Sequence, residues 1–292
     1  MEANRTYLFC PGNHPRKVEK VFGADADVVI LDLEDAVAIA EKPATRAVAV
    51  EALKQTRRCR GYVRVNAYDT EYCYGDICAI VGSWLDGIVL PKLESVDDLH
   101  SVDWLLSNLE RERGMEVGSV DLMPIIETAR GQDAVRAIAQ AGTRIKRLSF
   151  GAGDYTKDLG MEWSLSEHEL ASMRAEMVVA SRLGELEPPV DTVFIHIKED
   201  EAFRVSCELV RDLGFQGKLC IHPDQISTAN TAFTPTEEQL AFAKKVIDAF
   251  VEAEAAGSAS IQIDGYFVDY PIVDKAQRIV DIAEAIARAE AA

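Results

Sequence analysis

The sequence lacks three features that would each point to a particular class of protein. Its six cysteines form no CxxC pair, no apolar run approaches the length of a membrane span, and basic residues are not in excess. The cysteine spacing therefore favours neither a zinc site nor a disulfide framework. Residues 1–5 also lack the basic and apolar regions of a signal peptide. We expect a reduced, cytoplasmic protein with no membrane partner.

The scarcity of basic residues limits the possible partners further. The chain has 31 Lys and Arg against 49 Asp and Glu, a formal charge of −18. This balance argues against a general affinity for nucleic acid or anionic membranes. A local basic cluster remains possible near the first apolar run, at Arg5, His14, Arg16, Lys17 and Lys20.

Eight short apolar runs recur along the chain and predict eight strands. They cover residues 7–10, 27–32, 62–66, 87–91, 121–126, 145–150, 192–197 and 218–221. Most are rich in Val, Ile, Leu and Phe without strict alternation, which is typical of parallel strands buried on both faces. Stretches long enough for a helix lie between most of them, including residues 15–22, 42–56, 96–112 and 132–142. The pattern predicts an α/β fold, a TIM (β/α)8 barrel. An open doubly wound sheet is the alternative.

A C-terminal extension is predicted after the barrel. Thr234, Pro235 and Glu237 match a capping box with proline at the first helical position, which predicts a helix to about Ala255. An Ala-, Glu-, Gly- and Ser-rich stretch, residues 252–260, follows the barrel and marks its junction with the tail.

A hairpin and a last helix complete this extension, at residues 261–263, 266–268 and 272–289. The hairpin is indicated by Asp264 and Gly265 between two apolar runs. All eight predicted barrel strands precede this extension, so it adds no strand to the barrel. We expect either a lid or arm against a neighbouring subunit, with Asp269 at the end of the hairpin, or a simple packing cap. The predicted domains are a catalytic TIM barrel, residues 1–233, and a helix–hairpin–helix lid and oligomerisation extension, residues 234–292.

Charged and polar residues follow several of the predicted strands, where barrel enzymes place their chemistry. They are Asp32, Glu34, Asp35, Arg64, Asn66, Lys92, Glu127, Asp154 and His222. Glu127 and Asp154 follow neighbouring strands, and two bare carboxylates in one pocket repel unless a cation compensates them. Mg²⁺ with retained waters fits two carboxylates and no nearby sulfur. The acids after the second run could orient the metal's waters, although each acid alone is more often a solvated loop residue.

Two basic residues have two interpretations each. Arg64 lies in an apolar strand, where an unpaired guanidinium is costly to bury. It either pairs with one of the acids or faces the pocket to hold an anionic or carbonyl oxygen. The same alternatives apply to Lys92. We assign no chemistry to His222 or His196.

Eight motifs in the same order make the chain similar to a known superfamily. They are RTYLFCPGNHPRKVEK from residue 5, DVVILDLEDAV at 27–37, YVRVN at 62–66, DGIVLPKLES at 86–95, PIIET at 124–128, LSFGAGDYTKDLG at 148–160, CIHPDQI at 220–226 and DGYFVDYP at 264–271. The chain resembles the HpcH/HpaI aldolase and citrate lyase β-subunit superfamily, and within it the CitE-like proteins that include malyl-CoA and citramalyl-CoA lyases.

The resemblance implies a Mg²⁺-dependent carbon–carbon lyase that cleaves or forms a 3-hydroxyacyl-CoA thioester. The metal would bind Glu127 and Asp154, and Glu127 thereby counts among the catalytic residues. Arg64 would stabilise the thioester enolate. Asp269, on a lid from an adjacent subunit, would protonate this enolate. A homotrimer or a hexamer of trimers is implied.

The resemblance also implies a binding site for coenzyme A as part of the substrate. Arg5 and Lys20 belong to an amino-terminal basic segment that contacts coenzyme A in relatives, and we place Lys92 with them as a third binding residue. Two positions depart from the superfamily pattern: Gly153, where many relatives carry an acid, and Cys10, where they have valine. The aromatic segment 68–74 could shape a different acyl pocket or pack on the surface.

Other activities of this scaffold stay open at this point. One is an acyl-CoA thioesterase, and another is a citrate lyase β-subunit that acts on an acyl group attached to a carrier protein. A third is a class II aldolase for free ketoacids, although His14 lies outside the histidine pattern of those relatives. A non-catalytic binding protein is disfavoured because Glu127, Asp154, Arg64 and Asp269 are all present.

Overall fold

The computed structural model describes residues 3–291, and the chain divides into two compact units. The first unit is Asn4–Asn230, and the second contains the residues from Thr231 onward together with Ala3. Each unit is described by itself. Within residues 3–291, none of the helices combines the length and apolar character needed to cross a membrane.

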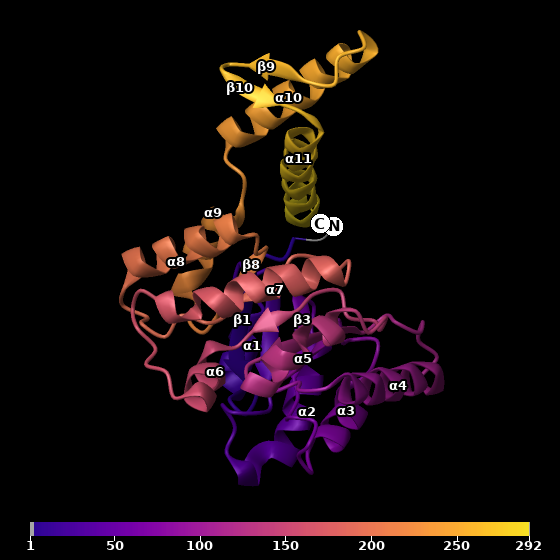
Figure 1. The fold of residues 1–292 in the computed structure, drawn as a ribbon. Helices are drawn as coiled ribbons and strands as arrows, with labels where there is room; N and C mark the ends of the chain where they lie inside the picture. Colours follow the sequence, from indigo (N-terminus) through magenta and orange to yellow (C-terminus); the bar gives the residue numbers. More distant parts are fainter. Residues whose placement is uncertain (1–2, 292) are drawn as a thin grey trace. The chain divides into compact units, whose positions relative to one another are not determined.

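The first unit is a closed parallel barrel, as predicted (Figure 1). Its strands are β1 (Thr6–Pro11), β2 (Val28–Asp32), β3 (Arg60–Arg64), β4 (Gly87–Leu90), β5 (Asp121–Ile126), β6 (Ser149–Phe150), β7 (Val190–Asp191) and β8 (Gly217–Cys220). Each strand pairs with the next, and β1 pairs with β8, Tyr7 lying opposite Leu219. This closure excludes the open doubly wound sheet. All carboxyl ends of the strands therefore meet at one rim.

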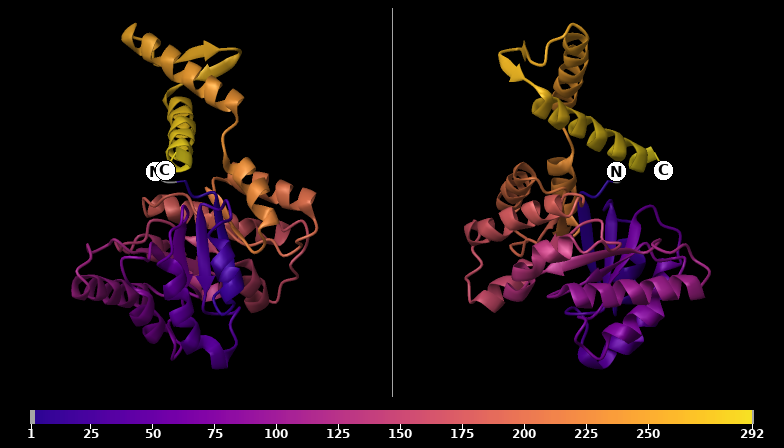
Figure 2. Two further views of the ribbon diagram at one scale, coloured as in Figure 1. Left: turned by 180° about the vertical axis from the view of Figure 1, so that it is seen from behind. Right: turned by 45° about the vertical axis from the view of Figure 1, so that its right-hand side comes forward.

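Helices on the outside of the strands cover the barrel (Figure 2). They are α1 (Pro15–Val21), α2 (Lys42–Leu53), α3 (Cys73–Ile80), α4 (Val96–Glu112), α5 (Ala129–Ala139), α6 (Ala152–Leu159), α7 (Ala171–Leu183), α8 (Asp200–Leu213) and α9 (Asp224–Phe233), with short 3₁₀ turns at Ile39–Glu41 and His168–Leu170. Local signals fix some starts: the Ser95 hydroxyl accepts from the Asp98 N–H at α4, and Thr128 accepts from Gly131 at α5.

Two of the predicted strands differ from the structure, one in its length and the other in its position. The sixth is only Ser149–Phe150, and the seventh is Val190–Asp191, which lies before the predicted residues 192–197. After β7 the strand pairing stops: the Thr192 hydroxyl accepts the Ala152 N–H at 2.8 Å, and Val193 still packs against the barrel core. Ile195 and Ile197 are 44% and 42% exposed. The apolar run misled the prediction because these side chains face outward from a loop.

The interior of the barrel is apolar in the middle and polar at the amino end of the strands. Its core includes Tyr7, Val28, Ile30, Tyr62, Val89, Met123, Ile125, Val190 and Leu219. At the amino end, the fully buried Arg147 donates to Asp121 and, at 2.8 Å, to Glu187, and the Tyr62 hydroxyl donates to Asp121 at 2.5 Å. This polar layer closes the amino end, so a site for a ligand is left at the opposite rim.

The second unit contains α10 (Glu237–Ala255), the antiparallel strands β9 (Ile261–Ile263) and β10 (Tyr266–Val268), and α11 (Tyr270–Ala291). Its own core includes Val246, Phe250, Ile263 and Val268. The hairpin is confirmed, and its turn residues Asp264 and Gly265 have φ of 50° and 87°. Positive φ at both central positions is the conformation that an Asp-Gly hairpin turn requires.

The capping residues predicted for α10 are wrong by two positions. Thr236, not Thr234, is the N-cap: its hydroxyl accepts the Gln239 N–H at 3.1 Å, and the Gln239 side chain accepts the Thr236 N–H at 2.9 Å. Both threonines fit the sequence pattern, but only Thr236 has an amide side chain three residues later that reaches back. Pro235 therefore precedes the helix.

Candidate active site

Four of the predicted site residues meet at the carboxyl rim of the barrel. Arg64 ends β3, Lys92 follows β4, Glu127 follows β5 and Asp154 lies in the first turn of α6, directly after β6. Lys92 links them, because its backbone N–H donates to Glu127 Oε1 at 2.9 Å and its Nζ lies 3.0 Å from Asp154 Oδ2.

Arg64 is held from two sides. Its Nε and Nη2 each donate to Asp32 at 2.7 Å, and its guanidinium lies over the Phe9 ring at 4.8 Å. Burial acts to raise the pKa of Asp32, but Arg64 and two backbone N–H donors outweigh it and hold that pKa below the usual value. The structure therefore shows the first interpretation, pairing with acids: Asp32 binds Nε and Nη2, and Nη1 lies 3.1 Å from Glu34 Oε2.

Lys92 lies among carboxylates. Besides Asp154, its Nζ donates to Glu34 Oε1 and lies 3.6 Å from Asp35 Oδ2. Burial acts to lower the pKa of Lys92, but these carboxylates outweigh it and raise the pKa. The ammonium is therefore charged.

Glu127 has the most perturbed carboxyl group of the cluster. It is 4% exposed, and burial raises its pKa to about 8, with Arg64 and Lys92 acting against this rise and the nearby carboxylates adding to it. Burial also raises the pKa of Glu34. Carboxyl groups outnumber cations at the rim: five, on Asp32, Glu34, Asp35, Glu127 and Asp154, lie near Arg64, Lys92 and Lys157.

Glycine at position 151 is required by Glu127. A Cβ at Gly151 would lie 2.2 Å from Glu127 Oε2, so any larger residue would displace the carboxylate. At Gly153 the nearest atom to such a Cβ is in Trp163, at 3.7 Å, an ordinary contact distance. The departure at Gly153 therefore leaves space next to Asp154 that a side chain could occupy.

A buried network that the sequence analysis did not predict holds the acidic loop after β2. The Lys42 Nζ donates to the carbonyls of Leu33 and Glu34, at 3.2 and 2.7 Å, and to Asn66 Oδ1 at 2.5 Å. Asn66 in turn donates to Asp76 at 2.7 Å. Asn66 was recognisable from its place after a strand. Lys42 was not, because a lysine in the first turn of a helix is ordinarily solvated.

The predicted acids Asp32, Glu34 and Asp35 also belong to this cluster, whereas Arg5 does not. Arg5 precedes β1, at the amino end of the barrel, and forms a two-bonded ion pair with Asp27 at 2.9 and 3.0 Å. Lys20 is exposed in the last turn of α1. Asp269 belongs to the second unit, where its carbonyl accepts the Ile272 N–H at 3.0 Å at the start of α11.

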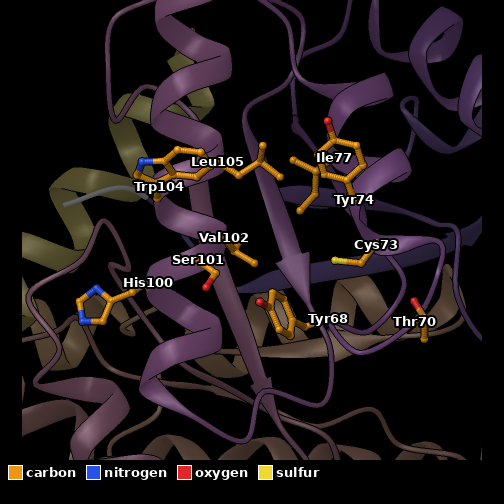
Figure 3. A pocket seen from close by; sticks show the side chains of 10 residues that line it. All are labelled: Tyr68, Thr70, Cys73, Tyr74, Ile77, His100, Ser101, Val102, Trp104 and Leu105. Atoms are coloured by element: carbon orange, nitrogen blue, oxygen red, sulfur yellow. The ribbon is translucent and has the colours of Figure 1, made fainter.

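The aromatic segment 68–74 lines a separate groove. A pocket of about 620 Å³ lies between α3 with its preceding loop and α4 (Figure 3). Its walls contain Tyr68, Thr70, Cys73, Tyr74, Ile77, His100, Ser101, Val102, Trp104 and Leu105. These ten residues do not include any member of the acidic cluster. The groove is therefore distinct from the carboxylate site.

The donors present allow two kinds of ligand. Within residues 3–291 no three Cys, His, Asp or Glu side chains are grouped as a complete metal site. Two carboxylates from Glu127 and Asp154, completed by water or substrate, are nevertheless a usual donor set for Mg²⁺, which retains several non-protein ligands. The guanidinium of Arg64 can hold an anionic oxygen beside it.

Comparisons of the sequence with known proteins found a matching family and similar relatives. A sequence model of the HpcH/HpaI aldolase/citrate lyase family matches residues 5–223. Citrate lyase subunit beta of Leuconostoc mesenteroides subsp. cremoris is 37% identical over 285 residues, 96% of this chain and 93% of that protein. An L-malyl-CoA/beta-methylmalyl-CoA lyase of Cereibacter sphaeroides is 34% identical over 308 residues, 97% of this chain and 95% of that protein.

A solved structure extends the likeness to the fold. The protein CitE from Mycobacterium tuberculosis, in complex with magnesium, acetoacetate and coenzyme A, aligns with a TM-score of 0.77 and 29% identity. The alignment covers 97% of this chain and 98% of that chain.

Proposed function

Because the chain belongs to the HpcH/HpaI aldolase/citrate lyase family, we propose that it is a Mg²⁺-dependent lyase that cleaves or forms a carbon–carbon bond in a 3-hydroxyacyl-CoA thioester. The family supports lyase chemistry, and the malyl-CoA lyase relative and the CitE complex support coenzyme A and magnesium. The observation that supports the site best is a pair of carboxylates that both contact Lys92: the buried Glu127, on which the charge of Arg64 also acts, and the partly exposed Asp154.

The rim fits a divalent cation. It has five carboxyl groups and three cations, and burial raises the pKa of Glu127 to about 8. An added cation would relieve this excess of negative charge. Glu127 and Asp154 would hold the metal through hard oxygen donors. When bound, Mg²⁺ supplies a Lewis acid for the hydroxyl and carboxylate oxygens at the cleaved centre.

The chain's own residues bind the other half of the substrate. Asp32 and Phe9 fix the guanidinium of Arg64, so that it can stabilise negative charge on the thioester oxygen as the enolate forms. Loss of the 3-hydroxyl proton and cleavage of the carbon–carbon bond give a ketoacid and this enolate, and the carboxyl group of Asp269 gives a proton to the enolate carbon, so that no net proton is gained or lost. We propose that the exposed Lys20 attracts the phosphates of coenzyme A. We do not propose that Arg5 contacts coenzyme A, because its guanidinium is paired with Asp27 at the opposite end of the barrel.

We further propose that Asp269 acts on a neighbouring subunit of a homotrimer or hexamer, with the second unit as its lid. Mixing of two inactive variants tests this arrangement. Arg64→Met and Asp269→Asn chains, unfolded and refolded together, should regain activity at up to about a quarter of their sites if each site combines both residues from different subunits. No regain would refute action on a neighbour. We also propose a cytoplasmic location, which the free state of all six cysteines supports.

The deciding experiment is a lyase assay of the purified protein with Mg²⁺. Malyl-CoA, methylmalyl-CoA, citramalyl-CoA and citryl-CoA are tested, and ketoacid, shortened acyl-CoA and free thiol are measured separately. Ketoacid with a shortened acyl-CoA supports the proposal and names the substrate. Free coenzyme A with an intact hydroxyacid would instead identify a thioesterase. Asp154→Asn should abolish the activity, and Lys157→Met, on the exposed face of the same helix, is the matched control.

A second candidate is the β-subunit of a citrate lyase complex, favoured by the 37% identity to such a subunit. This enzyme would act on an acyl group attached to a carrier protein. The test is the same assay with the acyl group loaded on a carrier protein. Activity on the carrier alone would support the second candidate, and activity on free ketoacid aldols alone would identify a class II aldolase.

A further inference from the structure

Lys92 contacts both carboxylates that we propose as metal ligands. Its backbone N–H donates to Glu127 Oε1 at 2.9 Å, and its ammonium lies 3.0 Å from Asp154 Oδ2. The same ammonium donates to Glu34 and lies 3.6 Å from Asp35. One residue thus joins acids from three different strand ends.

The backbone conformation of Lys92 is also unusual. Its φ is 51°, in the left-handed region that residues other than glycine rarely adopt. Flanking bonds maintain this conformation: the N–H donates to Glu127, and the next N–H, of Leu93, donates to the Ile125 carbonyl at 3.3 Å. This conformation lets the backbone fix one carboxylate while the side chain reaches another. Strain of this kind is retained where the surrounding structure over-determines it, often at functional sites.

A metal ion bound to these carboxylates would repel the Lys92 ammonium. A Mg²⁺ ion bonds carboxylate oxygens at about 2.1 Å, so an ion bound through Asp154 Oδ2 would lie within about 5 Å of the ammonium, which is 3.0 Å from that oxygen. Two cations at this distance in a partly buried site repel strongly. The Lys92 side chain is 28% exposed, and Glu34 and Asp35 offer it other carboxylates. It can therefore leave Asp154 without losing every partner.

We propose that Lys92 is an internal counter-ion for the metal carboxylates: it holds them together in the metal-free enzyme, releases Asp154 when the metal binds, and so weakens metal affinity. This inference rests on the proposed metal site. It differs from the role in substrate binding predicted from the sequence. Lys92 is here a positioning residue, acting through the carboxylates.

Lys157 offers a matched control. Its Nζ lies 3.6 Å from Asp154 Oδ1, the other oxygen of the same carboxylate, but its side chain is 82% exposed. Solvent screens such a charge, so its removal should alter metal affinity little. The two lysines have the same charge and the same partner, and they differ in burial and in their contacts with the other acids.

The test is a titration of metal-free protein with Mn²⁺ alone, with free Mn²⁺ measured by electron paramagnetic resonance. Lys92→Met removes the charge. Lys92→Gly removes it in a residue that adopts positive φ without strain, and it keeps the N–H to Glu127. Both variants should bind Mn²⁺ at least about tenfold more tightly than the unaltered chain. Lys157→Met should change the Kd by less than about twofold.

Each outcome decides the question. Unchanged or weaker Mn²⁺ binding in both Lys92 variants, with the unaltered chain binding normally, refutes the counter-ion and leaves the proposed function standing. Absence of binding in all four proteins refutes the metal site and the counter-ion together. If the variants do not fold, amine labelling of the unaltered chain takes their place: saturating Mn²⁺ should speed the labelling of Lys92 more than that of Lys157, and an unchanged rate at Lys92 refutes the inference.

Discussion

The buried carboxyl group of Glu127 should make the stability of the metal-free barrel depend on pH in an unusual direction. Its pKa is raised from 4.5 to about 8 in the folded protein. Between these values the folded state binds more protons than the unfolded state, so the free energy of unfolding falls as pH rises through this interval. At about 1.36 kcal/mol per pKa unit, the ceiling of this effect is about 5 kcal/mol.

Glu127→Gln removes this titration and keeps the shape of the side chain. We expect the variant to match the unaltered protein at pH 4.5 and to exceed it by about 2 to 4 kcal/mol at pH 8, below the ceiling because neighbouring groups adjust. Urea denaturation with a chelator present measures the difference. The three tryptophans, Trp84, Trp104 and Trp163, all lie in the barrel unit, so their fluorescence reports its unfolding alone.

A second carboxyl group serves as the control for this experiment. Arg136 donates two hydrogen bonds to Glu176 and holds the pKa of this carboxyl below its usual value. Glu176 therefore stabilises the fold above its unfolded pKa, and this contribution is lost on acidification. Glu176→Gln should be the less stable protein at neutral pH, opposite in sign to Glu127→Gln. Equal pH slopes for Glu127→Gln and the unaltered chain would refute the argument from burial.

Further predictions concern the same rim. Gly151→Ala should displace Glu127 and lower turnover by at least about a hundredfold, whereas Gly153→Ala should cost less than about threefold, both measured in the lyase assay. Arg64→Met leaves Asp32 buried without its guanidinium and should lower the free energy of unfolding by about 3 kcal/mol, so an unchanged urea midpoint would contradict the role of the pair. Removal of divalent metal with a chelator should abolish turnover and leave the far-ultraviolet circular dichroism unchanged, because the rim is not part of the core.

The positions of most strands and helices could be predicted from the sequence because their signals are local. The run at residues 121–126 is buried throughout, as its composition indicates, and α4 covers residues 96–112, the range predicted for a helix. The run at 192–197 failed because apolar composition does not distinguish a buried strand from a loop with outward-facing isoleucines. The prediction of the hairpin at Asp264 and Gly265 was correct because these two adjacent residues determine the positive φ angles of its turn.

The order of the strands by itself determined that Arg64, Lys92, Glu127 and Asp154 would meet at one rim, because parallel strands in a closed barrel end on the same side. Only the tertiary structure decided what these residues do to one another. The contacts of Lys92 with four acids depend on side-chain directions and on a positive φ. The burial that raises the pKa of Glu127 depends on packing across the barrel. Such distances and burial arise from residues far apart in the sequence, and no local pattern encodes them.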